Sequence, residues 1–364
     1  MKHILKTATV LLLSACMLLS LLGCALLNAL GITEPDSVIV VEPTKAPHTE
    51  PAVQPTQSAQ PKPTDTPNPT DAPKPTDTPG PTDAPTPKPT ETPSSFLFGG
   101  EKVTAGQTAV KVVGKKNAII RISPEEMDML IALCPNLTNL ELDYCCMADY
   151  SRIGELTGLK RLQITTTTHS QDYGIPLVDI DWVASLKNLR QLSLTYNKID
   201  DIRAISELDS LEELNLGWNA LSDEDLKWLT ELNLIKLYLY CNVDLRDASP
   251  LAKIESLELL HIGGNRQLYG FEALNTLPYL RELNLGYCPV KDLEWVKHFE
   301  SLETLTIAYT EYIDSDAYAA LAKCSSLKKV IVSKDDREIE KALRNMIRDL
   351  RPDIEIVYYE DYKG

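Results

Sequence analysis

The sequence is poor in histidine and in positive charge. Its 364 residues include five histidines, and 36 lysines and arginines stand against 52 aspartates and glutamates, a formal net charge of −16. From residue 96 onward no HExxH zinc motif, phosphate-binding glycine loop or GxSxG nucleophile motif occurs. Nucleic acids and anionic lipid surfaces are bound through basic patches, which this composition does not favour. We therefore expect neither an enzyme nor a nucleic-acid-binding protein, and no metal or other cofactor.

Cysteines are present but not in a pattern that suits a metal. No CxxC pair occurs, and the adjacent Cys145 and Cys146 are poorly spaced for one ion. An exported domain could pair its cysteines as disulfides. Most of them, however, stand at positions where a small buried side chain is expected, so we favour free, buried thiols. Beyond residue 24 the cysteines are Cys134, Cys145, Cys146, Cys241, Cys288 and Cys324.

Long apolar runs are also missing, except at the start of the chain. Residues 8–22 are mostly apolar and follow two lysines, which is typical of a secretory signal. The run ends in Leu21-Leu-Gly-Cys24, which resembles the bacterial lipobox. This resemblance implies a signal peptide over residues 1–23, acylation of Cys24, and attachment to the extracellular face of a bacterial membrane through lipid alone. The alternatives are an ordinary signal peptide or an uncleaved membrane helix.

Residues 24–95 lack the apolar residues that a core requires. Residues 25–95 hold 17 of the 24 prolines, and a Pro-x-Pro-Thr-Asp-Thr/Ala hexamer repeats from Pro61 onward. Such a sequence favours a polyproline II conformation with a rise of ~3.1 Å per residue. We expect a disordered, semi-rigid stalk that carries the following domain away from the membrane. Its threonines are candidates for O-glycosylation.

The rest of the chain is organised by a repeated motif. The motif is a leucine followed by apolar residues three and five positions later. It recurs nine times, from Leu137-x-x-Leu-x-Leu142 to Leu327-x-x-Val-x-Val332. Successive copies start 22 to 30 residues apart, mostly 22 or 23. Segments such as Leu211-Glu-Glu-Leu-Asn-Leu-Gly-Trp-Asn219 resemble the leucine-rich repeat family, and the period resembles its internalin-like, 22-residue class.

The repeat predicts an α/β solenoid over residues 137–332. Alternate apolar residues place one face of a short strand in a core that only stacked repeats can bury, so the strands should form a parallel sheet on the concave face. On the convex face, helices of one or two turns are expected from Asp181, Asp223 and Asp314, and a 3₁₀ or irregular segment over 201–206. A ladder of amides should bond the backbone where the chain leaves the strands. Its members are Asn197, Asn219, Asn242 and Asn265.

Both ends of a solenoid need caps. The N-terminal cap is expected over residues 96–136, with strand structure in 110–122 and a helix that begins at Pro124 with Ser123 as its N-cap. The C-terminal cap is expected over 333–364, as an amphipathic helix over 336–350 and an apolar strand from Ile354.

Aromatic residues make up 6% of the chain but concentrate in one slot of the repeat, two residues after the third apolar position. This aromatic row consists of Tyr144, Thr166, Tyr196, Trp218, Cys241, Gly264, Tyr287 and Tyr309. Beside it lie Tyr238, Tyr240 and His261. Exposed rings with polar neighbours are typical of binding surfaces, so we predict a partner-binding site here on the concave face. Alternatively, the rings pack on one another, or strand alternation turns them inward.

A second candidate site is the long step between the second and third repeats. Its extra residues fall near 165–176 and include His169, Asp172 and Tyr173. Insertions in repeat arrays form loops that often lie on the binding face. A tolerated surface loop is the alternative.

Together these features predict a monomeric bacterial surface lipoprotein that binds a protein or peptide through its concave face. The internalin resemblance implies a protein partner. Two alternatives stay open: a module that binds wall or dietary polysaccharide, and a structural protein of envelope assembly.

Overall fold

The computed structural model describes residues 93–115, 118–165, 177–310, 313, 315–333, 341, 345 and 349–359. They belong to one compact unit, Ala84–Gly364, and the unit Met1–Asp83 lies outside the described residues. The predicted signal peptide, the lipidation site Cys24 and nearly all of the predicted stalk therefore lie outside the described part as well. No helix among the described residues is long and apolar enough to cross a membrane.

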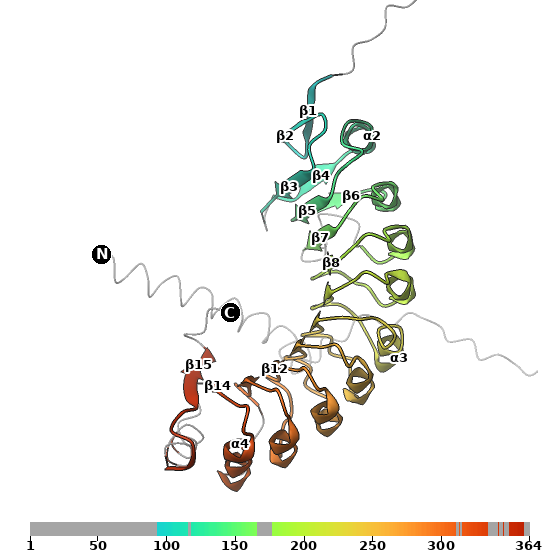
Figure 1. Ribbon diagram of the computed structural model, residues 1–364. Coiled ribbons are helices and arrows are strands. Elements are labelled where there is room, and N and C mark those ends of the chain that lie inside the picture. Colours follow the sequence, from blue (N-terminus) through green and yellow to red (C-terminus); the bar gives the residue numbers. More distant parts are fainter. Residues whose placement is uncertain are drawn as a thin grey trace, which may run out of the picture. The chain divides into compact units, whose positions relative to one another are not determined.

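One parallel sheet of 11 strands runs through the domain, with one strand from each of the nine predicted repeats and one added at each end. The strands line the inner side of the curved stack (Figure 1), as the repeat predicts. In spatial order they are β3 (Ala109–Val113), β5 (Asn139–Asp143), β7 (Arg161–Thr165), β8 (Gln191–Ser193), β9 (Glu213–Asn215), β10 (Lys236–Tyr238), β11 (Leu259–His261), β12 (Glu282–Asn284), β13 (Thr304–Thr306), β14 (Lys329–Val332) and β15 (Glu355–Tyr358).

The outer side of the stack carries short helices, most of them 3₁₀ turns. The segment from Asp181 is a single 3₁₀ turn, and the one predicted over 201–206 is 3₁₀ as well. The helix near Asp223 is capped by Ser222 and Asp225, and not by Asp223 itself. The turns are η1 (Ser151–Glu155), η2 (Asp181–Ser185), η3 (Arg203–Glu207), α3 (Asp223–Leu226), η4 (Ser249–Lys253), η5 (Phe271–Thr276), η6 (Glu294–His298), η7 (Ser315–Tyr318) and α4 (Ala319–Lys323).

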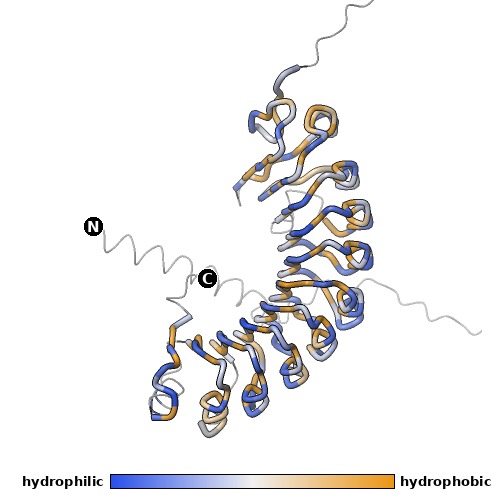
Figure 2. The backbone as a smooth tube through the Cα atoms, in the orientation of Figure 1, coloured by the Kyte–Doolittle hydropathy of each residue, from blue (hydrophilic) through white to orange (hydrophobic). Residues whose placement is uncertain are grey.

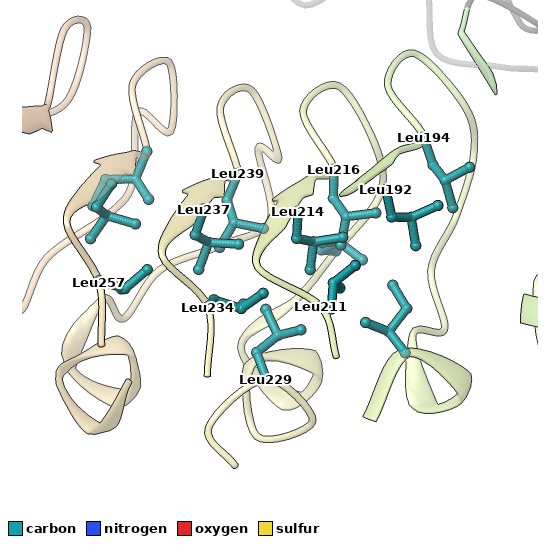
Figure 3. Packing of buried hydrophobic residues seen from close by; sticks show 14 of the residues in the cluster. Leu192, Leu194, Leu211, Leu214, Leu216, Leu229, Leu234, Leu237, Leu239 and Leu257 are labelled. Atoms are coloured by element: carbon teal, nitrogen blue, oxygen red, sulfur yellow. The ribbon is translucent and has the colours of Figure 1, made fainter. Parts of the chain in front are cut away.

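The core is a ladder of leucines between the sheet and the outer turns. In β9 and its equivalents the motif leucines are almost completely buried, and leucines of neighbouring repeats lie side by side (Figure 3). Leu214, for example, pairs in register with Leu192 on one side and Leu237 on the other. The same alternation of apolar and polar stretches recurs in every repeat (Figure 2). Each repeat thus buries its apolar face only against its neighbours.

The N-terminal cap is built around one glutamate. The predicted helix is α2 (Pro124–Leu133), and Ser123 and Glu126 form a reciprocal capping box, with Ser123 N donating to Glu126 Oε2 at 2.7 Å. The other carboxylate oxygen of Glu126 accepts from Gly99 N at 2.8 Å. Gly99 belongs to the turn between β1 (Ser95–Phe98) and β2 (Glu101–Thr104). Glu126 therefore fixes both the helix and the hairpin above it.

The predicted strand over 110–122 consists of two strands in different sheets. The first is β3 of the main sheet, and the second is β4 (Ile120–Ile122), which pairs with β6 (Cys145–Met147). At the other end β15 pairs in parallel with β14, in agreement with the apolar run from Ile354. Arg351 supports this end, because its guanidinium donates to Cys324 O and Leu327 O at 3.0 Å each. The predicted helix over 336–350 lies largely outside the described residues.

The asparagine ladder is confirmed. Asn219 Nδ2 donates to Leu194 O at 2.8 Å and to Leu216 O at 3.0 Å, so that its amide joins two repeats. Thiols take the same place elsewhere: Cys288 Sγ donates to Ile262 O at 3.3 Å. The six cysteines of the described part are thiols that form no disulfide with one another, and five are buried as predicted. Cys241 differs, because it is only half-buried.

Candidate binding surface

Every described member of the aromatic row has a left-handed backbone. The values of φ are 50° at Tyr144, 59° at Tyr196, 57° at Trp218, 56° at Cys241, 61° at Tyr287 and 55° at Tyr309, with Gly264 at 82°. A left-handed conformation costs a non-glycine residue about 1–2 kcal/mol. It also ends the regular alternation of the strand. The side chains are consequently half-buried at the ends of the strands and are not turned fully into the core.

The rings of the aromatic row stack on one another. Tyr196 and Trp218 lie with their centroids 5.1 Å apart and an interplanar angle of 11°. Tyr287 and Tyr309 are 4.6 Å apart at 13°. Tyr359, just after β15, meets both of the latter rings edge-on at 6.5 and 6.0 Å. Ring packing along the stack, which was one alternative from the sequence, is thus part of the structure.

A second aromatic group lies on strands β10 and β11 and in the turn just after β10. Tyr240 stacks on His261 with centroids 4.9 Å apart, and Tyr238 meets His261 edge-on at 6.1 Å. Tyr240 has room because residue 217 in the neighbouring repeat is glycine, whose missing Cβ would collide with the tyrosine ring. Burial lowers the pKa of His261 to about 4, so its imidazole is neutral at physiological pH. The three predicted residues Tyr238, Tyr240 and His261 therefore form one cluster.

Charge is excluded from the middle of the concave face. The central strand positions from β8 to β13 carry Ser193, Asn215, Tyr238, His261, Asn284 and Thr306. Charged residues flank this line and pair with one another: Lys236 lies 3.5 Å from Glu213, and Lys328 lies 2.9 Å from Glu303. The hydrogen bond from Lys328 lowers the pKa of Glu303. The centre thus offers rings, amides and hydroxyls instead of a strong electrostatic field.

Metal-ligating side chains do not gather in the described part of the chain. No group of three or more histidine, cysteine, aspartate or glutamate side chains in that part of the chain could hold a metal ion. The loop candidates His169, Asp172 and Tyr173 lie outside the described residues. Sequence reasoning missed the left-handed backbone of the row and the contact from Tyr359. A signal for the first was present, because Gly264 occupies the same slot as the rings.

Comparisons with known proteins agree on the repeat. The leucine rich repeat family model matches residues 174–221. Leucine-rich repeat-containing protein 56 of Rattus norvegicus is 32% identical over 89 residues, which are 24% of this chain and 15% of that protein. The protein phosphatase 1 regulatory inhibitor subunit homolog of Arabidopsis thaliana is 25% identical over 182 residues, 49% of this chain and 54% of that protein. The chain thus matches about half or less of these relatives' lengths.

Two solved structures are similar as well. An internalin from Listeria monocytogenes has 19% sequence identity and a TM-score of 0.42, with 72% of this chain and 90% of that chain covered. A TDR receptor has 18% identity and a TM-score of 0.44, with 68% and 46% covered.

Proposed function

We propose that this leucine-rich repeat protein is a surface lipoprotein that binds a protein or peptide segment along its concave face. Stacks of repeats are typical binding modules, because they present a long, continuous sheet surface. The observation that carries the proposal is the aromatic row together with the cluster of Tyr238, Tyr240 and His261. These rings are half-buried, so that part of each is open to solvent, and they border an uncharged, polar strip.

The chemistry of this face suits a polypeptide. Tyrosine and tryptophan give large contact areas with few rotatable bonds, and they are prominent among the residues that dominate protein interfaces. Asn215 and Asn284 add amide groups on either side of the cluster, although their Oδ1 atoms accept from Gly217 N at 3.1 Å and Gly286 N at 3.0 Å. The Asn215 side chain also hydrogen-bonds to Tyr240, so it supports the cluster, and the amino group of Asn284 is the proposed donor to a main-chain carbonyl of an extended partner.

The membrane anchor is the second part of the proposal. Cys24, at the end of the lipobox-like Leu21-Leu-Gly-Cys24, carries the lipid, and the proline-rich residues after it hold the repeat domain away from the membrane. Metabolic labelling with a fatty acid tests this directly. The full chain incorporates label and sediments with membranes, whereas Cys24→Ser does neither. A Cys24→Ser chain that remains on the membrane contradicts lipid anchoring.

The binding face is tested by replacing its tyrosines with residues that occur at the equivalent positions of other repeats. In Tyr238→Gln the new residue matches Gln163, and in Tyr240→Thr it matches Thr195. The full-length double variant should fold as the wild type does, with far-UV circular dichroism and urea midpoint as checks. A matched control is Tyr279→Ala, because that tyrosine is 62% exposed but lies in the turn before β12, off the concave strands.

Wild type and variants are immobilised and exposed to envelope extract and to host surface proteins. We expect a protein that the wild type and Tyr279→Ala capture, and that the double variant loses by about tenfold or more, the loss that a central interface residue causes. Equal capture by all three contradicts the concave face as the site. Release of the partner by free oligosaccharide favours the glycan alternative.

A further inference from the structure

The aromatic row is interrupted at its middle. Tyr196 and Trp218 form one stack and Tyr287 and Tyr309 another, while Cys241 and Gly264 stand between them. The repeats of Trp218 and Tyr287 are three strands apart in the sheet, from β9 to β12. With strands spaced by ~4.8 Å, the two ring positions are roughly 14 Å apart. Because neighbouring rings in the row are 5.1 and 4.6 Å apart, two ring positions are missing.

The two residues at this interruption, Cys241 and Gly264, are small and apolar. A Cβ on Gly264 would come within 2.5 Å of Cys241 Sγ, so the thiol lies over the bare glycine. Cys241 is only half-buried, unlike the other five cysteines of the described part. The backbone would accept a ring there, because φ at Cys241 is 56° and φ at Trp218 is 57°. The absence of a ring at residue 241 is therefore not imposed by backbone geometry.

The same two repeats have one extra residue in the turn that follows the asparagine of the ladder. Two residues separate Asn242 from Leu245 and also Asn265 from Leu268, whereas one residue separates Asn219 from Leu221. The extra residue disturbs the asparagine ladder: Leu221 N donates to Asn242 Oδ1 at 3.2 Å, but the buried Asn265 Oδ1 has no hydrogen-bond partner among the described residues.

Two exposed apolar side chains follow the interruption along the chain. Val243 is 52% exposed in the widened turn directly after Asn242, and Tyr269 is 58% exposed five residues after Gly264. A gap between two ring stacks, lined by small residues, is typical of a place where a partner's side chain is received.

We propose that this interruption, named here the ring gap and defined by Cys241 and Gly264 between Trp218 and Tyr287, receives an aromatic side chain of a bound peptide segment. The incoming ring stacks on the face of Trp218 and continues the row. The inference rests on the proposed function and specifies the partner's chemistry. A sugar ring fits less well, because the nearest amides, Asn242 and Asn265, are buried and their Nδ2 groups donate to backbone carbonyls.

The test introduces an aromatic side chain of the protein itself into the ring gap. Cys241→Tyr should place a ring beside Trp218, in a backbone conformation that tyrosine already adopts at Tyr196 and Tyr287. The matched control is Cys241→Ser, which leaves the space open. The probe is a displayed library of random 12-residue peptides, panned against the full-length wild-type chain. Urea midpoints and circular dichroism of each variant verify folding.

We expect the enriched peptides to share an aromatic residue. They should bind Cys241→Ser with wild-type affinity and Cys241→Tyr about tenfold or more weakly. If Cys241→Tyr folds poorly, Trp218→Gly replaces it, because it removes the stacking face and suits the left-handed backbone; the same loss is expected.

Two outcomes overturn the ring gap. Enriched peptides that bind Cys241→Tyr and Trp218→Gly as tightly as wild type, yet lose affinity for Tyr238→Gln/Tyr240→Thr, refute the gap and leave the concave-face function standing. Failure to enrich any peptide counts against the gap and against a peptide-binding function together.

Discussion

The contact between Gly264 and Cys241 allows a quantitative test of the row's geometry. Gly264→Ala introduces two separate penalties. Alanine at φ 82° is in the left-handed region, which costs about 1–2 kcal/mol. The new Cβ also stands 2.5 Å from Cys241 Sγ, and overpacking of this kind costs typically about 1–3 kcal/mol. The single variant should therefore lose roughly 2–5 kcal/mol of unfolding free energy.

The two penalties are separated by a second substitution. Cys241→Ala removes the sulfur, and the next contacts of the new Cβ are Cys241 N at 3.3 Å and Cys241 Cα at 3.5 Å, close to ordinary van der Waals distances. In Cys241→Ala/Gly264→Ala the steric part should disappear and the backbone part should remain. The double-mutant cycle should thus give a coupling of about 1–3 kcal/mol in favour of the double variant.

The assay is urea unfolding of the wild type, both single variants and the double variant, followed by tryptophan fluorescence and circular dichroism. Free energies are compared only where the slope m stays constant, since repeat proteins do not always unfold in two states. Additivity within about 0.5 kcal/mol would refute the predicted contact between the thiol and residue 264. A Gly264→Ala variant as stable as wild type would refute the left-handed backbone as well.

Two further predictions concern the ladder and the cluster. Asn242→Ala removes one of the two amide donors of Leu216 O and of Leu239 O, which keep Asn219 Nδ2 and Asn265 Nδ2, and it takes away the Oδ1 acceptor of Leu221 N. We therefore expect a loss of about 1–3 kcal/mol in urea unfolding, and a smaller loss for Asn242→Cys, since Cys288 fills the equivalent place. For His261, burial lowers the pKa from 6.5 to about 4, so protonation opposes folding: the stability is present above pH 6.5 and is lost as pH falls toward 4. Urea midpoints between pH 7.5 and 4.5 should fall more steeply for wild type than for His261→Gln, by up to about 3 kcal/mol at the acid end, and parallel curves would contradict this.

The fold was predictable from the sequence to the level of single strands. Each of the nine motif copies became one strand of the sheet, because alternate apolar residues fix which side of a strand is buried. The cap of α2 was predictable for a similar reason, since Ser123 and Pro124 have specific roles at a helix start. Local chemistry and global burial agree at these positions.

The outer turns and the candidate site were less predictable. Acidic residues at Asp181 and Asp223 suggested helices, but one became a 3₁₀ turn and the other is capped by Ser222, since a short connection leaves little room for a regular helix. At the aromatic row, periodicity describes burial and contains no information about φ. Tyrosine and tryptophan are uncommon in left-handed conformations, so only Gly264 in the same slot indicated one.

The energetics of the row bear on why its composition varies along the stack. A left-handed tyrosine costs about 1–2 kcal/mol of folding free energy. A stacked aromatic pair stabilises the fold by about 0.5–1.5 kcal/mol in addition to the contribution from the area that it buries. Cys241 bears the same left-handed cost as Trp218, so a ring and a small residue in this slot differ mainly by the stacking contribution. Stability alone therefore does not explain a small residue at Cys241 where Trp218 carries a ring. Residues 218 and 241 differ in the surface that they present to a partner. That difference matters only when a partner binds. If so, Cys241→Tyr should keep the unfolding free energy of wild type or raise it by up to about 1.5 kcal/mol while it weakens peptide binding about tenfold or more, a combination that a purely structural row would not produce.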